Sequence, residues 1–174
     1  NIMQGVVAST PAELAAHLSA RGRKLAIQRL VGTVGGERTT GELAIERGAS
    51  VPRVTGRLAV DAASLAGLAE TVLGSGVLDF PVVASRSPWP EAPFGPALFD
   101  SLDSDLALSF GALALTDDVA MHNVTLALRS STSGTGFDDI TGEFAGGKAG
   151  GNLLIKRDLD GSAGMYRLKE ELLR

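Results

Sequence analysis

The sequence predicts a strand-rich α+β fold, in which antiparallel β-meander modules repeat along a curved sheet and each module is followed by a short amphipathic helix. Three observations support this fold class. Glycine supplies 22 of the 174 residues and aromatic residues only 5%, which is typical of many short strands and turns. Apolar residues alternate with a period of two along much of the chain. A motif of Gly-Gly followed by Gly-x-Leu-x-Ile-x-Arg occurs twice, in residues 35–47 and 146–157.

The first part of the chain, residues 1–74, is interpreted as the tail of one module. Thr10 and Pro11 suit the start of a helix, and Leu14 and Leu18 then fall on one helical face, which predicts a helix over 11–21. After this segment the apolar period changes to two, and each alternating run ends at Gly or Pro. These runs predict three strands, near residues 24–34, 38–47 and 52–60.

A second helix and a connector are predicted next. Leu65, Leu68 and Leu73 fall at helical spacing, which predicts a short amphipathic helix over residues 61–73. Five of the seven prolines then lie within residues 75–98. Because proline removes a hydrogen-bond donor from a strand, this segment is interpreted as a connector between modules.

The second module is predicted over residues 99–174. Apolar alternation extends from residue 106 to 128 and resumes from 140 to 155, with polar or glycine-rich turns between the runs. This pattern predicts an antiparallel meander. The chain then turns toward a final helix, which is predicted to start near Ala163.

Composition excludes several classes of partner and site. With 16 basic and 20 acidic residues the net charge is −4, so we expect no binding to nucleic acid. The longest apolar runs are much shorter than the roughly 20 residues that a membrane-spanning helix requires. Because the chain begins with Asn1 rather than Met, it is interpreted as a fragment, and a membrane anchor is expected only in the full-length protein.

No pattern of residues points to catalysis or to a bound metal. The chain has no cysteine, and neither His17 nor His122 has a second ligand at metal-binding spacing. Acidic residues come in pairs, at 103 and 105, 117–118 and 138–139, and each pair is interpreted as a strand start or a turn. No phosphate-binding loop or nucleophile elbow occurs. The sequence therefore predicts a protein that is not an enzyme and that binds no cofactor or metal.

The stretch from Phe99 to Leu173 resembles the AsmA-like C-terminal region of the AsmA family of Gram-negative envelope proteins. The resemblance rests on an Asp-x-Asp-Leu-x-Leu strand at 103–108, a Leu-x-Leu strand at 113–115, an alternating strand at 124–128 and a glycine-rich strand pair at 140–151. Residues 30–73 look like the tail of the preceding unit of the same kind.

This resemblance implies a location and a mode of action. Family members are periplasmic, are anchored in the inner membrane, and consist of β-sheet modules that form a long apolar groove for phospholipid movement and outer membrane assembly. The implied partners are phospholipid acyl chains and the other repeats of the parent chain. Full anchoring and bridging are expected only for that parent chain.

The apolar residues of the second module are the candidate groove, in which acyl chains would be bound by burial. The alternative is a structural or protein-interaction repeat domain whose helices cover the same residues as a closed core, and strand periodicity does not separate the two. The candidate residues are Leu106, Leu108, Phe110, Leu113, Leu115, Val124, Leu126, Leu128, Phe144, Leu153 and Ile155.

Overall fold

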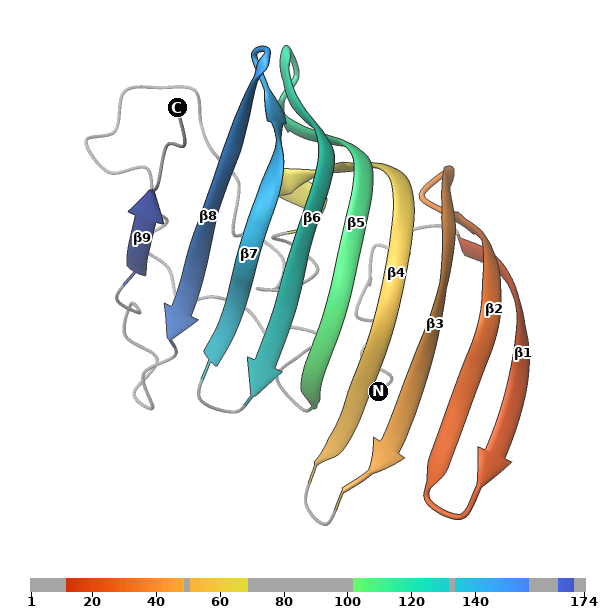
Figure 1. The fold of residues 1–174 in the computed structure, drawn as a ribbon. Coiled ribbons are helices and arrows are strands. Elements are labelled where there is room, and N and C mark those ends of the chain that lie inside the picture. The colour runs from red at the N-terminus through yellow and green to blue at the C-terminus, as the bar shows by residue number, and fades with distance from the viewer. Residues whose placement is uncertain (1–11, 49–50, 69–101, 132–133, 157–165, 171–174) are drawn as a thin grey trace, which may run out of the picture.

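The fold is a single β-sheet, shown in Figure 1. The computed structural model describes residues 12–48, 51–68, 102–131, 134–156 and 166–170. Within these residues nine strands form one open sheet in which spatial order follows chain order. The strands are β1 (Ala12–Arg21), β2 (Lys24–Val34), β3 (Glu37–Arg47), β4 (Pro52–Ser64), β5 (Asp103–Thr116), β6 (Val119–Ser131), β7 (Gly134–Phe144), β8 (Gly147–Lys156) and β9 (Tyr166–Glu170).

The predicted strand-rich character is confirmed, and the three strands of the first part lie close to where they were predicted, as β2, β3 and β4. Both copies of the repeated motif form a strand after a tight turn, because Gly36 and Gly146 adopt positive φ angles before β3 and β8. The connector predicted over residues 75–98 lies outside the described residues.

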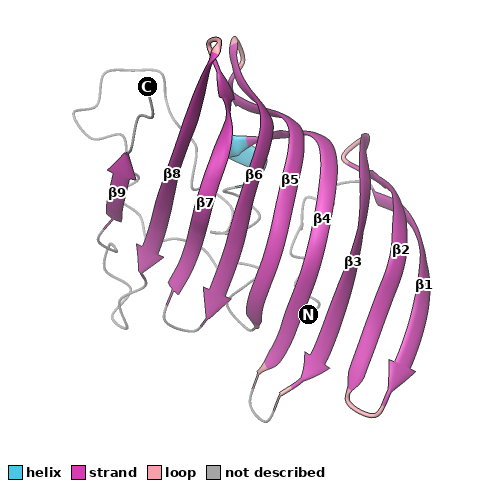
Figure 2. Ribbon diagram, viewed as in Figure 1, coloured by secondary structure: helices cyan, strands magenta, loops and turns pink. Residues whose placement is uncertain are grey.

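The two halves of the sheet meet at its one parallel pair of strands. All other neighbouring strands in the described sheet are antiparallel, whereas β4 and β5 run parallel from Arg53 and Asp103 to Ser64 and Ala114. A parallel pair requires a connection that crosses over one face of the sheet. Residues 65–68 begin this connection as a helical turn, shown in Figure 2, and the Ser64 hydroxyl accepts a 3.0 Å hydrogen bond from the Gly67 amide.

The helix predicted over residues 61–73 therefore starts later than expected. Residues 61–64 extend β4, where they pair with β5, and helical geometry begins only at residue 65. The part of the predicted helix beyond residue 68 lies outside the described residues.

The helix predicted over residues 11–21 is wrong, because residues 12–21 form strand β1. Leu14 and Leu18 are four residues apart, a spacing that places two side chains on one face of a helix and also on one face of a strand. The residues between them are mostly alanine, which leaves the local preference weak. Pairing with β2 decides the outcome, from Ala12 opposite Val34 to Arg21 opposite Lys24.

The final helix predicted from about Ala163 is also corrected. Residues 166–170 form β9, which pairs antiparallel with β8. The structure thus does not support modules that are each followed by an amphipathic helix. The described residues instead form one continuous mixed sheet with a single helical turn.

One line of aligned positions crosses the whole sheet and is apolar on every strand except β4. We call it the apolar row, the face that carries it the apolar face, and the opposite side the polar face. The register continues the row to Leu168 of β9. Its other members are Leu18, Ile27, Leu43, Gly56, Leu106, Leu128, Phe137 and Leu153.

Glycine occupies the row on β4 because no side chain fits there. Gly56 has a φ of +149°, and a Cβ atom at this position would lie 2.2 Å from the carbonyl oxygen of Glu42. A positive φ and a close backbone approach both favour glycine. The gap in the row is therefore imposed by the pairing of β3 with β4.

β-Bulges keep the apolar residues in phase. Arg29, Asn123 and Asp139 have φ angles of 51–52° and lie where the register shifts between neighbouring strands. Each shift inserts one residue into one strand of a pair. On β2 the insertion after Ile27 leaves Leu30 on the same face, where it is 8% exposed.

The apolar face is buried in its centre and exposed at its β1 end. The buried cluster on β5 and β6 is at most 8% exposed, and Leu68 of the helical turn packs against it. At the β1 end Leu14 is 52% and Leu18 63% exposed. The buried cluster consists of Leu106, Phe110, Leu113, Val124, Leu126 and Leu128.

This gradient predicts different costs for the same substitution. Leu128 is 1% exposed, so Leu128→Ala is expected to lower the free energy of unfolding by about 2–5 kcal/mol through the cavity that it leaves. Leu18→Ala, at the exposed end of the same row, is expected to cost less than about 0.5 kcal/mol. Urea denaturation followed by circular dichroism measures both, and equal losses would contradict the gradient.

Candidate functional site

The structure brings nine of the eleven predicted groove residues together on the apolar face. Six of them form the buried cluster, and Leu108, Leu115 and Leu153 are partly buried and pack against it. Phe144 is 41% exposed at the end of β7, next to the turn into β8. Ile155 lies on β8 opposite Thr135.

The prediction missed that the first half of the chain contributes to the same surface. Leu43, Val54 and Val60 of β3 and β4 pack against the buried cluster, and Ile27 continues the apolar row on β2. The alternation in residues 24–60 predicts strands, but as part of a separate module. Only the parallel pairing of β4 with β5 joins the two halves into one face.

The polar face carries side chains that link the same strands by charge. The Asp105 carboxylate lies 3.9 Å from the Arg53 guanidinium and 3.8 Å from that of Arg129, which is 2.8 Å from Asp138. Arg57 pairs with Glu42 across β3 and β4 at 3.0 Å. Together these ion pairs connect β3 to β7 on the side of the sheet opposite the apolar row.

The acidic pairs thus have structural roles in the described residues. Asp103 starts β5 and residues 117–118 form the turn between β5 and β6, as predicted. The expectation for Asp138 and Asp139 is wrong, because they lie within β7 rather than at its start or in a turn. Asp139 is the bulged residue there, and its amide donates a 2.8 Å hydrogen bond to the Asn152 side chain.

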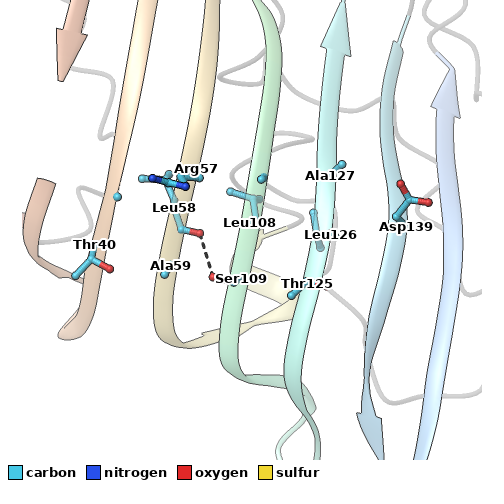
Figure 3. Close-up of a pocket in the computed structure, with 12 residues that line it drawn as sticks. Thr40, Arg57, Leu58, Ala59, Leu108, Ser109, Thr125, Leu126, Ala127 and Asp139 are labelled. Carbon is cyan, nitrogen blue, oxygen red and sulfur yellow. Dashed lines mark hydrogen bonds between the residues drawn. The ribbon is translucent and has the colours of Figure 1, made fainter. Parts of the chain in front are cut away.

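A shallow cavity of about 470 Å³ lies over β3 to β7. Its lining includes small residues of the polar face, among them Ala59, Ala107 and Ala127, with Arg57 and Asp139 on opposite sides, as Figure 3 shows. The Ser109 hydroxyl in this cavity donates a 3.5 Å hydrogen bond to the carbonyl of Leu58, across the parallel junction. The lining residues therefore show no hydroxyl held by a base.

Among the described residues, no group of three or more His, Asp or Glu side chains is placed to hold a metal ion. No helix in that part of the chain has the length and apolar character needed to cross a membrane. Comparison of the sequence with protein-family models and with curated proteins, and of the structure with solved structures, finds no match.

The ion pairs of the polar face are expected to contribute little to stability. All of the charged side chains around Asp105 are at least 38% exposed, so Asp105→Asn should lower the free energy of unfolding by less than about 1 kcal/mol. The loss should disappear in 1 M salt, because salt screens exposed charges. Urea denaturation at low and high salt tests this, and a larger loss that persists in salt would disprove it.

Proposed function

We propose that the apolar face of this sheet binds phospholipid acyl chains, and that the chain is a non-enzymatic fragment of an AsmA-like envelope protein that acts in lipid transport and outer membrane assembly. The observation that carries the proposal is the apolar row, which crosses an open sheet from β1 to β9 and lies opposite a charged face. At the β1 end of this face Leu14 and Leu18 are exposed, and an exposed apolar surface favours binding of an apolar partner.

The dimensions of the row suit an acyl chain. Neighbouring strands lie about 4.8 Å apart, so the row extends roughly 29 Å from β2 to β8. One leaflet of a bilayer has a hydrocarbon thickness of about 15 Å. A single acyl chain could therefore lie within the row without leaving it.

Burial alone would supply the affinity. Each methylene removed from water contributes about 0.8 kcal/mol, so ten buried methylenes contribute about 8 kcal/mol before the cost of ordering the chain. The exposed Leu14 and Leu18 offer the part of the face that a lipid reaches first. Movement of lipid would follow a gradient and would need no chemical step.

The proposed cellular location follows from the resemblance to the AsmA family. In it the parent protein is anchored in the inner membrane of a Gram-negative bacterium and its repeats extend through the periplasm. Further repeats of the parent chain would continue the sheet at its free edges. The parallel junction of β4 and β5 supports this arrangement, because it joins two runs of antiparallel strands into one sheet.

A second candidate function is a structural or protein-interaction domain with a closed core. The observation in its favour is the buried cluster, in which Val124 is fully buried and Leu68 packs against its neighbours. In this function the exposed end of the apolar face at β1 would bind another protein strand.

Native mass spectrometry after incubation with liposomes separates the two functions. With liposomes of phosphatidylethanolamine and phosphatidylglycerol, the wild-type chain is expected to retain stoichiometric phospholipid. Leu18→Asp should lower the bound fraction by about tenfold or more, because a carboxylate in the path of the acyl chain must be desolvated. A wild-type chain that stays free of lipid would contradict the proposal and favour the closed core.

The matched control is Val31→Asp, which places the same charge on the other face. Val31 is 48% exposed and lies between two apolar-face positions of β2, so its side chain belongs to the polar face. This variant should bind lipid as the wild type does. Far-ultraviolet circular dichroism should show that both variants keep the sheet.

A further inference from the structure

Three hydroxyl side chains interrupt the apolar face next to the apolar row. Ser104, Ser130 and Thr135 are aligned on β5, β6 and β7, one step along the strands from Leu106, Leu128 and Phe137. We call them the hydroxyl cluster. In the same line of positions β3 and β4 carry Ile45 and Val54, so the change from apolar to hydroxyl side chains is confined to the central strands.

These hydroxyls are buried as deeply as the leucines around them. Ser104 is 5% exposed, and Ser130 and Thr135 are each 6% exposed. The hydroxyls of Ser130 and Thr135 lie 3.1 Å apart and share a hydrogen bond. Within the described part of the chain, the buried Ser104 hydroxyl has no hydrogen-bond partner. Burial of such a group is unfavourable unless a partner satisfies it, so this atom indicates a polar partner on the apolar face.

The surroundings of the cluster define the chemistry of that partner. The charged neighbours Arg53, Asp105 and Arg129 are exposed on the polar face and pair with one another there. The hydroxyl cluster contains no charged side chain that could balance a phosphate or a carboxylate. A hydroxyl donor in an apolar, uncharged setting suits a neutral acceptor such as an ester carbonyl oxygen.

We infer that the hydroxyl cluster binds the ester carbonyl of a glycerolipid, with the Ser104 hydroxyl as donor, while the acyl chain of that ester lies along the neighbouring apolar row. The inference rests on the proposed function and adds to it one position at which a bound lipid is held in place on the sheet. Two residues along a strand span about 6.6 Å, so the cluster and the row are close enough to contact adjoining parts of one lipid. The phosphate of the headgroup would lie beyond the cluster, in water.

The test compares two lipids that differ only in the carbonyl. The wild-type chain is incubated with liposomes that contain equal amounts of a diester phosphatidylcholine and its diether analogue with the same alkyl chains, and bound lipid is quantified by native mass spectrometry. One neutral hydrogen bond predicts a preference of about threefold to tenfold for the diester. Ser104→Ala should bring the ratio close to one.

Ser109→Ala is the matched control, because it removes a hydroxyl from the same strand, at a position whose hydroxyl bonds to Leu58 across the sheet rather than to the cluster. It should keep the diester preference. Ser104→Ala is expected to fold with unchanged or slightly raised stability, since it removes an unpaired buried hydroxyl. A clear loss of stability in urea would show instead that this hydroxyl already has a structural partner.

The outcomes separate this inference from the proposed function. Equal binding of the diester and diether lipids to the wild-type chain would overturn the ester site and leave acyl-chain binding intact. Binding of neither lipid would overturn both. Diester preference that survives in Ser104→Ala would overturn the assignment to this residue.

Discussion

Register is the constraint on which this structure depends. Side chains of a strand alternate between faces, so a slip of one residue in any pair would transfer the apolar set of that strand to the charged face. Pairing from Leu18 on β1 to Leu168 on β9 keeps one apolar line intact. Where an extra residue occurs, a bulge absorbs it, and at Asp139 a hydrogen bond from the backbone amide to Asn152 stabilises the distortion.

The parallel pairing of β4 with β5 joins the apolar residues of both halves of the chain into one surface. Arg53 and Asp105 meet on the polar side of β4 and β5, and Leu58 lies beside Leu108 in the register of the same pair. Without the pairing of β4 with β5, the four strands β1 to β4 and the five strands β5 to β9 would be two separate sheets. Function as proposed here depends on their union, since a long apolar path needs both.

The two faces of the sheet have different roles. Exposed ion pairs and threonines cover one side, and they contribute specificity of pairing more than stability. The other side holds the leucines that stabilise the sheet, and near its β1 end the same kind of side chain is left exposed. On the apolar face the Ser104 hydroxyl is the one buried side-chain polar atom of the described residues that lacks a hydrogen-bond partner.

Sequence patterns predicted the strands well and the helices poorly, for physical reasons. Alternation such as that of Leu43 and Ile45 has only one interpretation, whereas the four-residue spacing of Leu14 and Leu18 fits a strand as well as a helix. The strand conformation of β1 and β9 is determined by their pairing with β2 and β8. Local residue propensity carries no information about this pairing. The junction joins residues such as Leu58 and Ser109, which are 51 positions apart.

Candidate residues of the groove could be predicted as a set because they share one strand period. Their burial could not, since an apolar face shows the same alternation beneath a helix and beneath a lipid. The sequence likewise does not show that strands β2, β3 and β4 contribute residues to the same apolar face, because this depends on the parallel pairing of β4 with β5. The unpaired hydroxyl of Ser104 has no signal in the sequence, where a serine at the start of a strand is ordinary.

Photo-crosslinking with a phospholipid that carries a diazirine near the end of one acyl chain tests the central claim most directly. After irradiation of the chain with liposomes that contain this probe, peptide mass spectrometry locates the labelled residues. The account predicts adducts on apolar-face residues such as Ile27, Leu43 and Phe137, from strands on both sides of the parallel junction. Adducts confined to the polar face, or their absence from a folded chain, would contradict it.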